Sequence, residues 1–220
     1  MNIRLWAILV ALLAAMGAFS WWLSAQQSKP EREDVKMPSA KQLDEMTNPK
    51  RPKLAKATFQ PGRVVVLNTN RGKIEFVLYE KDCPKTTARI VQLVQGGDYN
   101  GVAFPRAENW MIQTDPANRE VPPIGIEVAK GLLFEKGSVG MARASDNTYS
   151  NTSVFFIALE PAHHLDLRYT SLGRVISGTD VAGKIVMGDQ IKTASLRPLT
   201  AADRKRLDEL LKASTGRGTR

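Results

Sequence analysis

The alternation of apolar and polar residues predicts β-strands along most of the chain after residue 62. Residues 64–69 are an apolar run rich in β-branched side chains, and residues 73–79 alternate polar with apolar positions. The Asn-Arg-Gly turn signal at residues 70–72 separates them, which predicts a β-hairpin. Residues 84–95 change to helical spacing. Pro84 suits the first turn of this predicted helix, and two glycines follow its last apolar position.

Short apolar segments separated by turn residues continue through the second half of the chain. We predict strands at residues 101–106, 109–113, 137–142, 154–159, 171–176 and 190–196, and a second helix at 180–186. About eight short strands with two helices predict a mainly β fold. The expected architecture is a closed, antiparallel, eight-stranded barrel capped by the two helices, because closure removes exposed strand edges.

The N-terminal residues 5–23 contain no charged side chain, and their length is close to the roughly 20 residues that a membrane-spanning helix needs. Trp6 and the pair Trp21 and Trp22 suit the two membrane interfaces. We therefore predict a transmembrane anchor in residues 1–24, with the bulk of the chain on the extracytoplasmic (periplasmic) side. The alternative is a cleaved signal peptide that releases a secreted protein, although Leu23 is bulky for a cleavage site.

Two further segments flank the predicted domain, which spans residues 63–196. Residues 25–62 are rich in proline and charge without sustained apolar periodicity, so we predict a flexible linker. Residues 197–220 are predicted to form a basic C-terminal helix and tail. The helix spans residues 200–212, and we interpret it as a solvated helix that docks weakly on the domain.

Composition limits the chemistry that the chain can perform. The single cysteine, Cys83, excludes an internal disulfide framework, and only two adjacent histidines are present. We therefore expect no metal site and no cofactor. The net charge is +9, but residues 57–196 carry 15 basic and 14 acidic side chains, so the excess lies outside the predicted domain. No nucleic-acid partner is expected from a nearly neutral domain.

One segment combines an arginine with apolar and aromatic neighbours, namely residues 104–113, Phe-Pro-Arg-Ala-Glu-Asn-Trp-Met-Ile-Gln. Residues 141–143 (Met-Ala-Arg) and 153–157 (Ser-Val-Phe-Phe-Ile) add similar strand-like material. Together these runs resemble the cyclophilin family of peptidyl-prolyl isomerases, whose corresponding motifs build one pocket. The resemblance covers about residues 64–196 and implies the cyclophilin fold.

The resemblance also implies roles for individual residues. Arg106 matches the arginine that stabilises the twisted Xaa-Pro amide, and Gln113 matches a glutamine that holds its guanidinium group. The substrate-binding residues that it implies are Phe104, Trp110, Met111, Ala142, Arg143, Phe156, Leu165 and Tyr169. The chain departs from the family at Pro105 and Tyr169, where histidines are common, and at Val154, which replaces a glutamine. His164 replaces the tryptophan associated with cyclosporin binding.

The resulting hypothesis is a membrane-tethered isomerase that acts on Pro-containing polypeptides and assists the folding of exported proteins. One alternative is a catalytically weak cyclophilin-like module that binds Pro-containing segments. Another is a structural subunit of a membrane complex. The sequence predicts neither the client proteins nor the oligomeric state.

Overall fold

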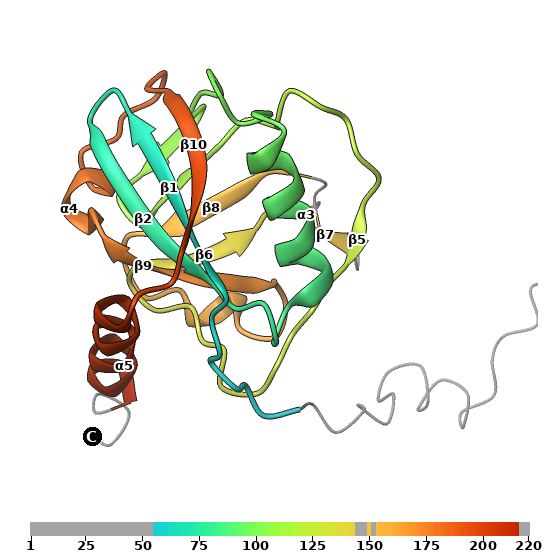
Figure 1. Ribbon diagram of the computed structural model, residues 1–220, viewed down its shortest axis with the longest axis vertical. Helices are drawn as coiled ribbons and strands as arrows, with labels where there is room; N and C mark the ends of the chain where they lie inside the picture. Colours follow the sequence, from blue (N-terminus) through green and yellow to red (C-terminus); the bar gives the residue numbers. More distant parts are fainter. Residues whose placement is uncertain (1–54, 144–148, 151–152, 216–220) are drawn as a thin grey trace, which may run out of the picture. The chain divides into compact units, whose positions relative to one another are not determined.

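A computed structural model describes residues 55–143, 149–150 and 153–215. All of them belong to one compact unit, Lys53–Arg220 (Figure 1). The predicted anchor and most of the predicted linker lie outside the described residues. The helices within the described residues are all too short or too polar to cross a membrane.

An antiparallel sheet of eight strands forms the body of the domain. Its order is β10-β1-β2-β9-β6-β8-β4-β3. The strands are β1 (Arg63–Thr69), β2 (Gly72–Leu78), β3 (Arg106–Glu108), β4 (Met111–Gln113), β6 (Ser138–Met141), β8 (Phe155–Ala158), β9 (Ser171–Ser177) and β10 (Ile191–Pro198). A separate pair joins β5 (Ile124–Gly125) to β7 (Tyr149–Ser150), which the sequence pattern did not predict.

The sheet curls, but its two end strands, β10 and β3, are not paired along their length. An isolated antiparallel bridge between Ala103 and Gln190 connects the segments that precede them. Around it, residues 101–104 and 188–191 exchange four backbone hydrogen bonds of 2.7–3.0 Å. The predicted strand at residues 101–106 is therefore wrong in its bounds, because regular pairing begins only at Arg106. The eight antiparallel strands are confirmed, whereas closure is limited to this bridge.

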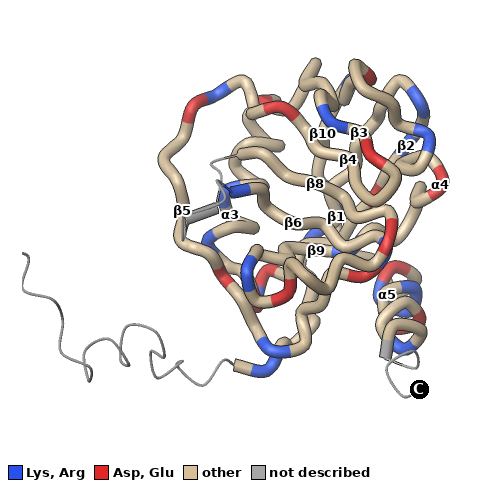
Figure 2. The backbone as a smooth tube through the Cα atoms, turned by 180° about the vertical axis from the view of Figure 1, so that it is seen from behind, with Lys and Arg blue, Asp and Glu red and all other residues tan. Residues whose placement is uncertain are grey.

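Within the residues that the structure describes, three α-helices accompany the sheet (Figure 2). Helix α3 (Pro84–Gln95) has the predicted bounds, and α4 (Thr179–Ala182) is shorter than predicted because Gly183 ends it. Glu127 lies at the N-terminus of α3, where its carboxylate accepts hydrogen bonds from the backbone N–H groups of Lys85 and Thr86. The third helix is α5 (Ala201–Thr215), and a short 3₁₀ turn spans His163–Leu165.

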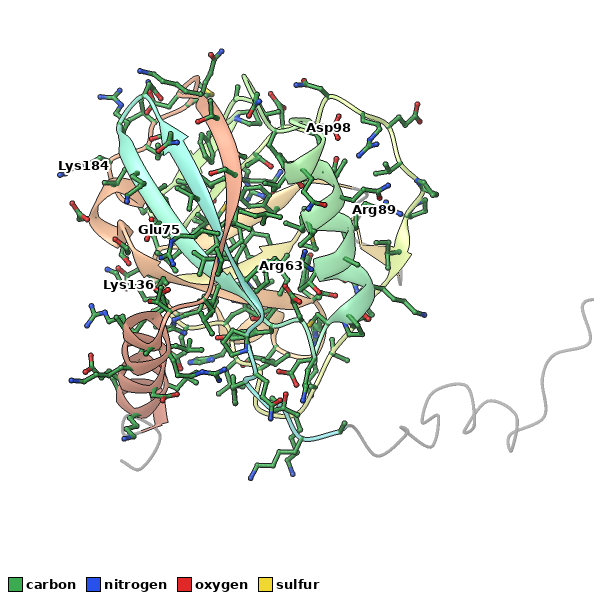
Figure 3. All side chains as sticks on the ribbon, in the orientation of Figure 1. Arg63, Glu75, Arg89, Asp98, Lys136 and Lys184 are labelled. Atoms are coloured by element: carbon green, nitrogen blue, oxygen red, sulfur yellow. The ribbon has the colours of Figure 1, made fainter. Side chains whose placement is uncertain are left out.

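The main core lies between the curled sheet and α3, where side chains fill the interior (Figure 3). The apolar faces of the strands and the Ile90 and Leu93 stripe of α3 meet there, as the periodicity predicts. The largest fully buried side chains include Leu67, Ile74, Phe76, Tyr99, Phe104, Ile112, Phe134, Met141 and Phe155.

Both ends of the described chain pack on the outside of this sheet. Ala57 is buried, and residues 55–57 exchange two backbone hydrogen bonds of 2.9 Å with Lys130. On α5, Leu207 is fully buried in a second apolar cluster with Val77 and Ile176. Residues that sequence analysis assigned to the linker and the tail thus contribute to the folded surface of the domain.

A charge cluster fixes the start of α5. Arg197 at the end of β10 donates hydrogen bonds to Glu75 and Asp203 at 2.6–3.0 Å. Thr200 and Asp203 also cap the helix by bonding to each other's backbone N–H groups. These hydrogen bonds from Arg197 lower the pKa of both carboxyl groups, while desolvation opposes the shift.

Candidate active site

A small pocket of about 90 Å³ brings together nine of the ten residues that sequence analysis singled out. They come from the β3–β4 hairpin, the ends of β6 and β8, and the loop around the 3₁₀ turn. The lining residues are Arg106, Trp110, Met111, Gln113, Ala142, Arg143, Phe156, Leu165 and Tyr169. The tenth, Phe104, is fully buried in the main core, so its predicted contact with substrate is not supported by the geometry.

Arg106 begins β3 at the edge of the sheet, and its side chain is 47% exposed. The guanidinium Nε donates to Oε1 of Glu108, and the other oxygen of that carboxylate accepts from the indole N–H of Trp110 at 2.7 Å. One carboxylate therefore orients the cation and the aromatic ring together. Its hydrogen bond from Arg106 lowers the pKa of Glu108, with a smaller contribution from Trp110 and an opposing one from desolvation.

This arrangement corrects the expectation about the partner of Arg106. Gln113 lies directly opposite Arg106 in the β3–β4 register, but no hydrogen bond joins their side chains among the described residues. Glu108 performs the role that was assigned to Gln113. The arginine itself is about half exposed, because the hairpin places it at the rim of the pocket.

Sequence reasoning missed Glu108, although a signal was present. Side chains two residues apart on a strand point to the same face, so Arg106 and Glu108 are neighbours on β3. Trp110 follows in the hairpin turn, where its carbonyl accepts a 2.7 Å hydrogen bond from the backbone N–H of Leu159. The spacing of Arg106, Glu108 and Trp110 at every second position therefore predicts their contacts once the hairpin is recognised.

The floor of the pocket is apolar and tightly packed. Met111, Phe156 and Leu165 are each at most 8% exposed. Beneath them, the ring of Phe134 stacks on Phe156 with centroids 5.6 Å apart. This stacking requires Gly140, because a Cβ at that position would lie within 2.6 Å of atoms in both rings. The floor is therefore rigid and suited to a compact apolar ring.

Polar and aromatic groups form the opposite rim. The guanidinium of Arg143 lies 5.0 Å from the centre of the Tyr169 ring and donates a 2.7 Å hydrogen bond to the carbonyl of Arg168. Tyr169 also meets Phe156 edge-on, at 6.2 Å between ring centroids. On the other side, Trp110 contacts His164 at 5.6 Å. The pocket thus has a cation on each side of an aromatic and aliphatic floor.

These groups suit binding and electrostatic stabilisation better than covalent chemistry. No group of three or more metal-ligand side chains occurs within the part of the chain that the structure describes. Cys83 is fully buried, and this burial raises the pKa of its thiol, which disfavours a thiolate nucleophile. A cation over an apolar pocket can instead donate hydrogen bonds to a bound amide.

Comparison with known proteins agrees with this geometry. Residues 64–202 match the family described as "Cyclophilin type peptidyl-prolyl cis-trans isomerase/CLD". The chain belongs to the cyclophilin family. The match includes the eight strands of the main sheet, apart from the first residue of β1, and every residue of the pocket described above.

Individual relatives extend this assignment. A probable peptidyl-prolyl cis-trans isomerase of Brucella suis is 34% identical over 155 residues, which cover 62% of this chain and 78% of the relative. Peptidyl-prolyl cis-trans isomerase A of Dickeya dadantii is 32% identical over 146 residues, which cover 61% of this chain and 75% of the relative. A Cryptosporidium parvum cyclophilin-type isomerase, crystallised in the presence of the dipeptide Ala-Pro, shares the fold. Its TM-score is 0.55 at 22% identity, with 62% of this chain and 99% of that chain covered.

Proposed function

We propose that this cyclophilin accelerates cis–trans isomerisation of Xaa-Pro bonds, with Arg106 as the donor that stabilises the twisted amide. The observation that carries the proposal is the position of the Arg106 guanidinium at the rim of an apolar pocket with a packed floor. The proline ring would occupy the floor formed by Met111, Phe156 and Leu165. Its amide would then lie at the rim, beside the guanidinium group.

The chemistry requires no nucleophile and no proton transfer. Amide resonance gives an Xaa-Pro bond a rotation barrier of about 18–20 kcal/mol, and twisting removes that resonance. The proline nitrogen then regains a lone pair that can accept a hydrogen bond. A donor that acts on this twisted form more strongly than on the planar form lowers the barrier, because catalysis depends on differential binding.

Arg106 alone does not account for a large acceleration. A preorganised transition-state donor contributes about 2.7–4 kcal/mol, whereas a 10⁴-fold acceleration needs about 5.5 kcal/mol. The remainder is assigned to the pocket, which grips the ring while the preceding carbonyl rotates. Bound substrate also covers the half-exposed guanidinium, and removal of water strengthens its interaction with the amide.

Glu108 is proposed as a positioning residue for this donor. It accepts from Nε of Arg106, which leaves the two terminal amino groups to face substrate. The same carboxylate accepts a hydrogen bond from Trp110, so the guanidinium group of Arg106 is held in a fixed position relative to one wall of the pocket. A donor fixed in this way needs little reorganisation when the amide twists.

A proline-isomerisation assay on the full-length chain tests the proposal. An Ala-Pro peptide should isomerise faster than its uncatalysed rate, in proportion to enzyme concentration. Saturable binding of the peptide without acceleration would instead support the module that binds Pro-containing segments.

The cellular setting forms a separate part of the proposal. The uncharged residues 5–23 and the tryptophans near both ends of this segment support a membrane anchor, with the isomerase on the extracytoplasmic side assisting the folding of exported proteins. The protein should remain in the membrane fraction after a carbonate wash, and protease added outside the inner membrane should cleave the domain. A soluble form that begins after residue 24 would replace the anchor with a signal peptide and leave the isomerase assignment intact.

A further inference from the structure

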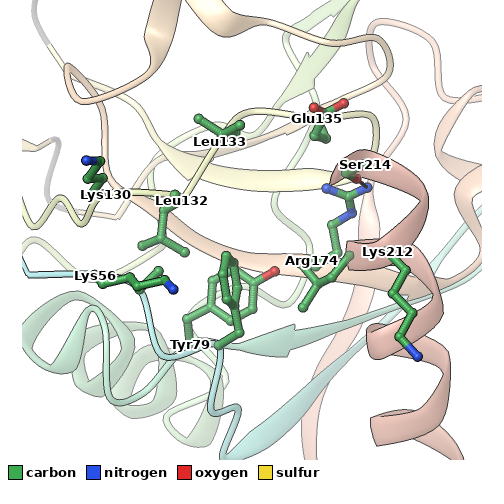
Figure 4. A pocket seen from close by; sticks show the side chains of 13 residues that line it. Lys56, Tyr79, Lys130, Leu132, Leu133, Glu135, Arg174, Lys212 and Ser214 are labelled. Carbon is green, nitrogen blue, oxygen red and sulfur yellow. Dashed lines mark hydrogen bonds between the residues drawn. The ribbon is translucent and has the colours of Figure 1, made fainter. Parts of the chain in front are cut away.

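A second cavity, larger than the candidate active site, lies where the two ends of the described chain meet the sheet. Its volume is about 400 Å³, within the range of sites that bind small molecules. Figure 4 shows it between residues 56–59, the loop at 130–135, β9 and the last turns of α5. The apolar lining residues are Ala57, Phe59, Leu132, Leu133 and Leu211, and the ring of Tyr79 adds to them.

The walls of this cavity come partly from outside the region shared with the family. Residues 56–59 precede the family match, which begins at residue 64, and residues 211–214 follow its end at residue 202. None of the lining residues takes part in the candidate active site. The family match therefore does not account for the whole of this cavity.

One end of the cavity holds a buried cation. Arg174 on β9 is 6% exposed, and no carboxylate lies within ion-pairing distance of it among the residues that the structure describes. Among these described residues, its terminal nitrogens reach only the hydroxyl oxygens of Ser138 and Ser214, both at 3.3 Å. Its Nε has no hydrogen-bond partner within the same described residues. A buried charge is normally paired, so this guanidinium could accept an anionic partner.

The electrostatic surroundings favour the same kind of partner. Burial lowers the pKa of Arg174, because the charged guanidinium is desolvated, and the charge of Glu135 only partly opposes this effect. Lysines 56, 130 and 212 also line the cavity, against the single acidic side chain of Glu135. In Figure 4 the Lys56 amine points toward Tyr79, while the guanidinium of Arg174 points toward Ser214 at the other side. An anion is thus favoured over a neutral or cationic ligand.

The distribution of free hydrogen-bonding groups in the cavity favours an acyl chain over a peptide as the ligand. A buried peptide would bring amide groups that need hydrogen-bond partners. The nearby backbone groups are already occupied, since Ala57 N–H donates to the Lys130 carbonyl and Lys130 N–H to that of Ala55. The three lysines of the lining are exposed to solvent, and the less exposed polar side chains, Glu135 and Ser214, lie around Arg174. A hydrocarbon chain with one charged end satisfies this distribution.

From these observations we infer that the cavity binds a fatty acid. Its carboxylate pairs with the guanidinium of Arg174, and its hydrocarbon chain lies along Tyr79 and Leu132 toward Ala57. Binding of this kind neutralises the buried charge and fills the apolar space in a single step. The site is independent of proline isomerisation, which takes place in the other pocket.

Equilibrium dialysis of radiolabelled dodecanoate against the full-length chain tests this inference, with dodecanol as the neutral probe of the same length. Arg174→Gln should weaken dodecanoate binding at least about tenfold, because a charge-assisted hydrogen bond is lost. Dodecanol binding should change by less than about twofold, since its tail contacts are retained. The uncharged residues 5–23 are identical in all variants, so a difference between them reports on the cavity.

A second pair of variants protects the test against misfolding of Arg174→Gln. Leu133 lines the cavity and is 45% exposed, so its substitution is compatible with folding. Leu133→Glu should weaken dodecanoate binding several-fold relative to Leu133→Gln, because the two differ only in charge.

Three results would overturn the inference. The first is equal dodecanoate affinity in the wild type, in Arg174→Gln and in Leu133→Glu. The second is absence of saturable dodecanoate binding to the wild-type chain. The third is displacement of dodecanoate by a short peptide with an apolar C-terminal residue at lower concentrations than by other fatty acids. That result would assign the cavity to a peptide carboxylate.

Discussion

Arg106 and Arg174 are both cations beside apolar pockets, but the fold surrounds them in opposite ways. Arg106 is 47% exposed at the end of a hairpin and has Glu108 as a carboxylate partner. Arg174 is 6% exposed in the middle of a sheet and has only hydroxyl partners among the described residues. The exposed arginine retains part of its hydration and stays available to substrate. The buried one has lost its hydration without gaining a counterion.

The two pockets also differ in size and origin. The pocket beside Arg106 measures about 90 Å³ and lies wholly within the family match, whereas the cavity beside Arg174 measures about 400 Å³. Residues outside that match complete the larger one. The comparison teaches that residues shared with the family specify a small site with a rigid floor. Residues on both sides of the family match complete a larger cavity, for which we propose an anionic ligand.

The largest expected effect is the loss of activity in Arg106→Ala. We expect kcat/KM to fall at least about 100-fold, equivalent to about 2.7 kcal/mol of transition-state stabilisation. The thermal midpoint should hardly change, because an exposed ion pair contributes about 0–1 kcal/mol. Peptide isomerisation and thermal unfolding should be measured on the same preparations.

Arg63→Ala is the matched control for this prediction. Arg63 is also an exposed arginine paired with a glutamate, Glu80, but it lies away from the pocket. The control should retain full activity. Equal turnover by Arg106→Ala and the wild type would end the proposed role of Arg106.

The next effect separates the stability that α5 contributes beside the large cavity from the activity of the small pocket. Leu207→Ala removes the fully buried anchor of α5 and should lower the free energy of unfolding by about 2 kcal/mol. The value is placed at the low end for such changes because α5 packs against the sheet on one side only. Urea unfolding measures it, with the partly buried Leu210→Ala as a control that should cost less.

The kcat/KM of folded Leu207→Ala should equal that of the wild type, because no residue of α5 lines the small pocket. A fall in activity that persists at temperatures where the variant is folded would show that the two regions are coupled.

A smaller effect is expected at Glu108. Glu108→Ala should lower kcat/KM about tenfold, since Arg106 keeps its charge but loses its fixed orientation. The loss should appear in kcat more than in KM, as expected for an interaction that matters in the transition state. Glu108→Gln should recover part of the activity, because its amide oxygen can still accept from Nε. A rise in KM with kcat unchanged would show that Glu108 acts in substrate binding instead.

The pH profile provides an independent check on the same contact. Arg106 lowers the pKa of Glu108 below its ordinary value of 4.5. The carboxylate therefore stays charged at neutral pH, and the contact is lost only as the pH falls through the lowered pKa. Wild-type activity should persist at pH 4.5, and an acid limb attributable to Glu108 should be absent from Glu108→Gln.

Much of the fold follows from local pattern, but its edges do not. The hairpin at residues 64–79 and helix α3 are fixed by alternation and by turn and end signals, which act within a few residues. Residues 101–106 are apolar enough to predict a strand, yet they face residues 188–191 across only one bridge. Whether an apolar run forms a regular strand depends on a partner almost 90 positions away, which local pattern does not contain.

The candidate site shows a similar division. The motif resemblance identified nine of the pocket residues, but not how Arg106 is held, because Gln113 and Glu108 are both close to it in sequence. Only the hairpin register reveals that the carboxylate is the partner. The second cavity had no sequence signal, since Ala57, Leu132 and Arg174 are assembled from segments far apart in the chain.

The smallest expected effect is on stability when the buried cation is removed. Arg174→Met should change the free energy of unfolding by less than about 1 kcal/mol, although the side chain is almost fully buried. The hydroxyl partners remain satisfied: Ser138 Oγ still accepts from the Glu135 N–H and donates to the Leu133 carbonyl, and Ser214 donates to Leu210. Methionine fills a similar volume without a desolvated charge. Urea unfolding in ligand-free buffer checks this value, and a loss of about 3 kcal/mol or more would show that the protein itself compensates the charge of Arg174.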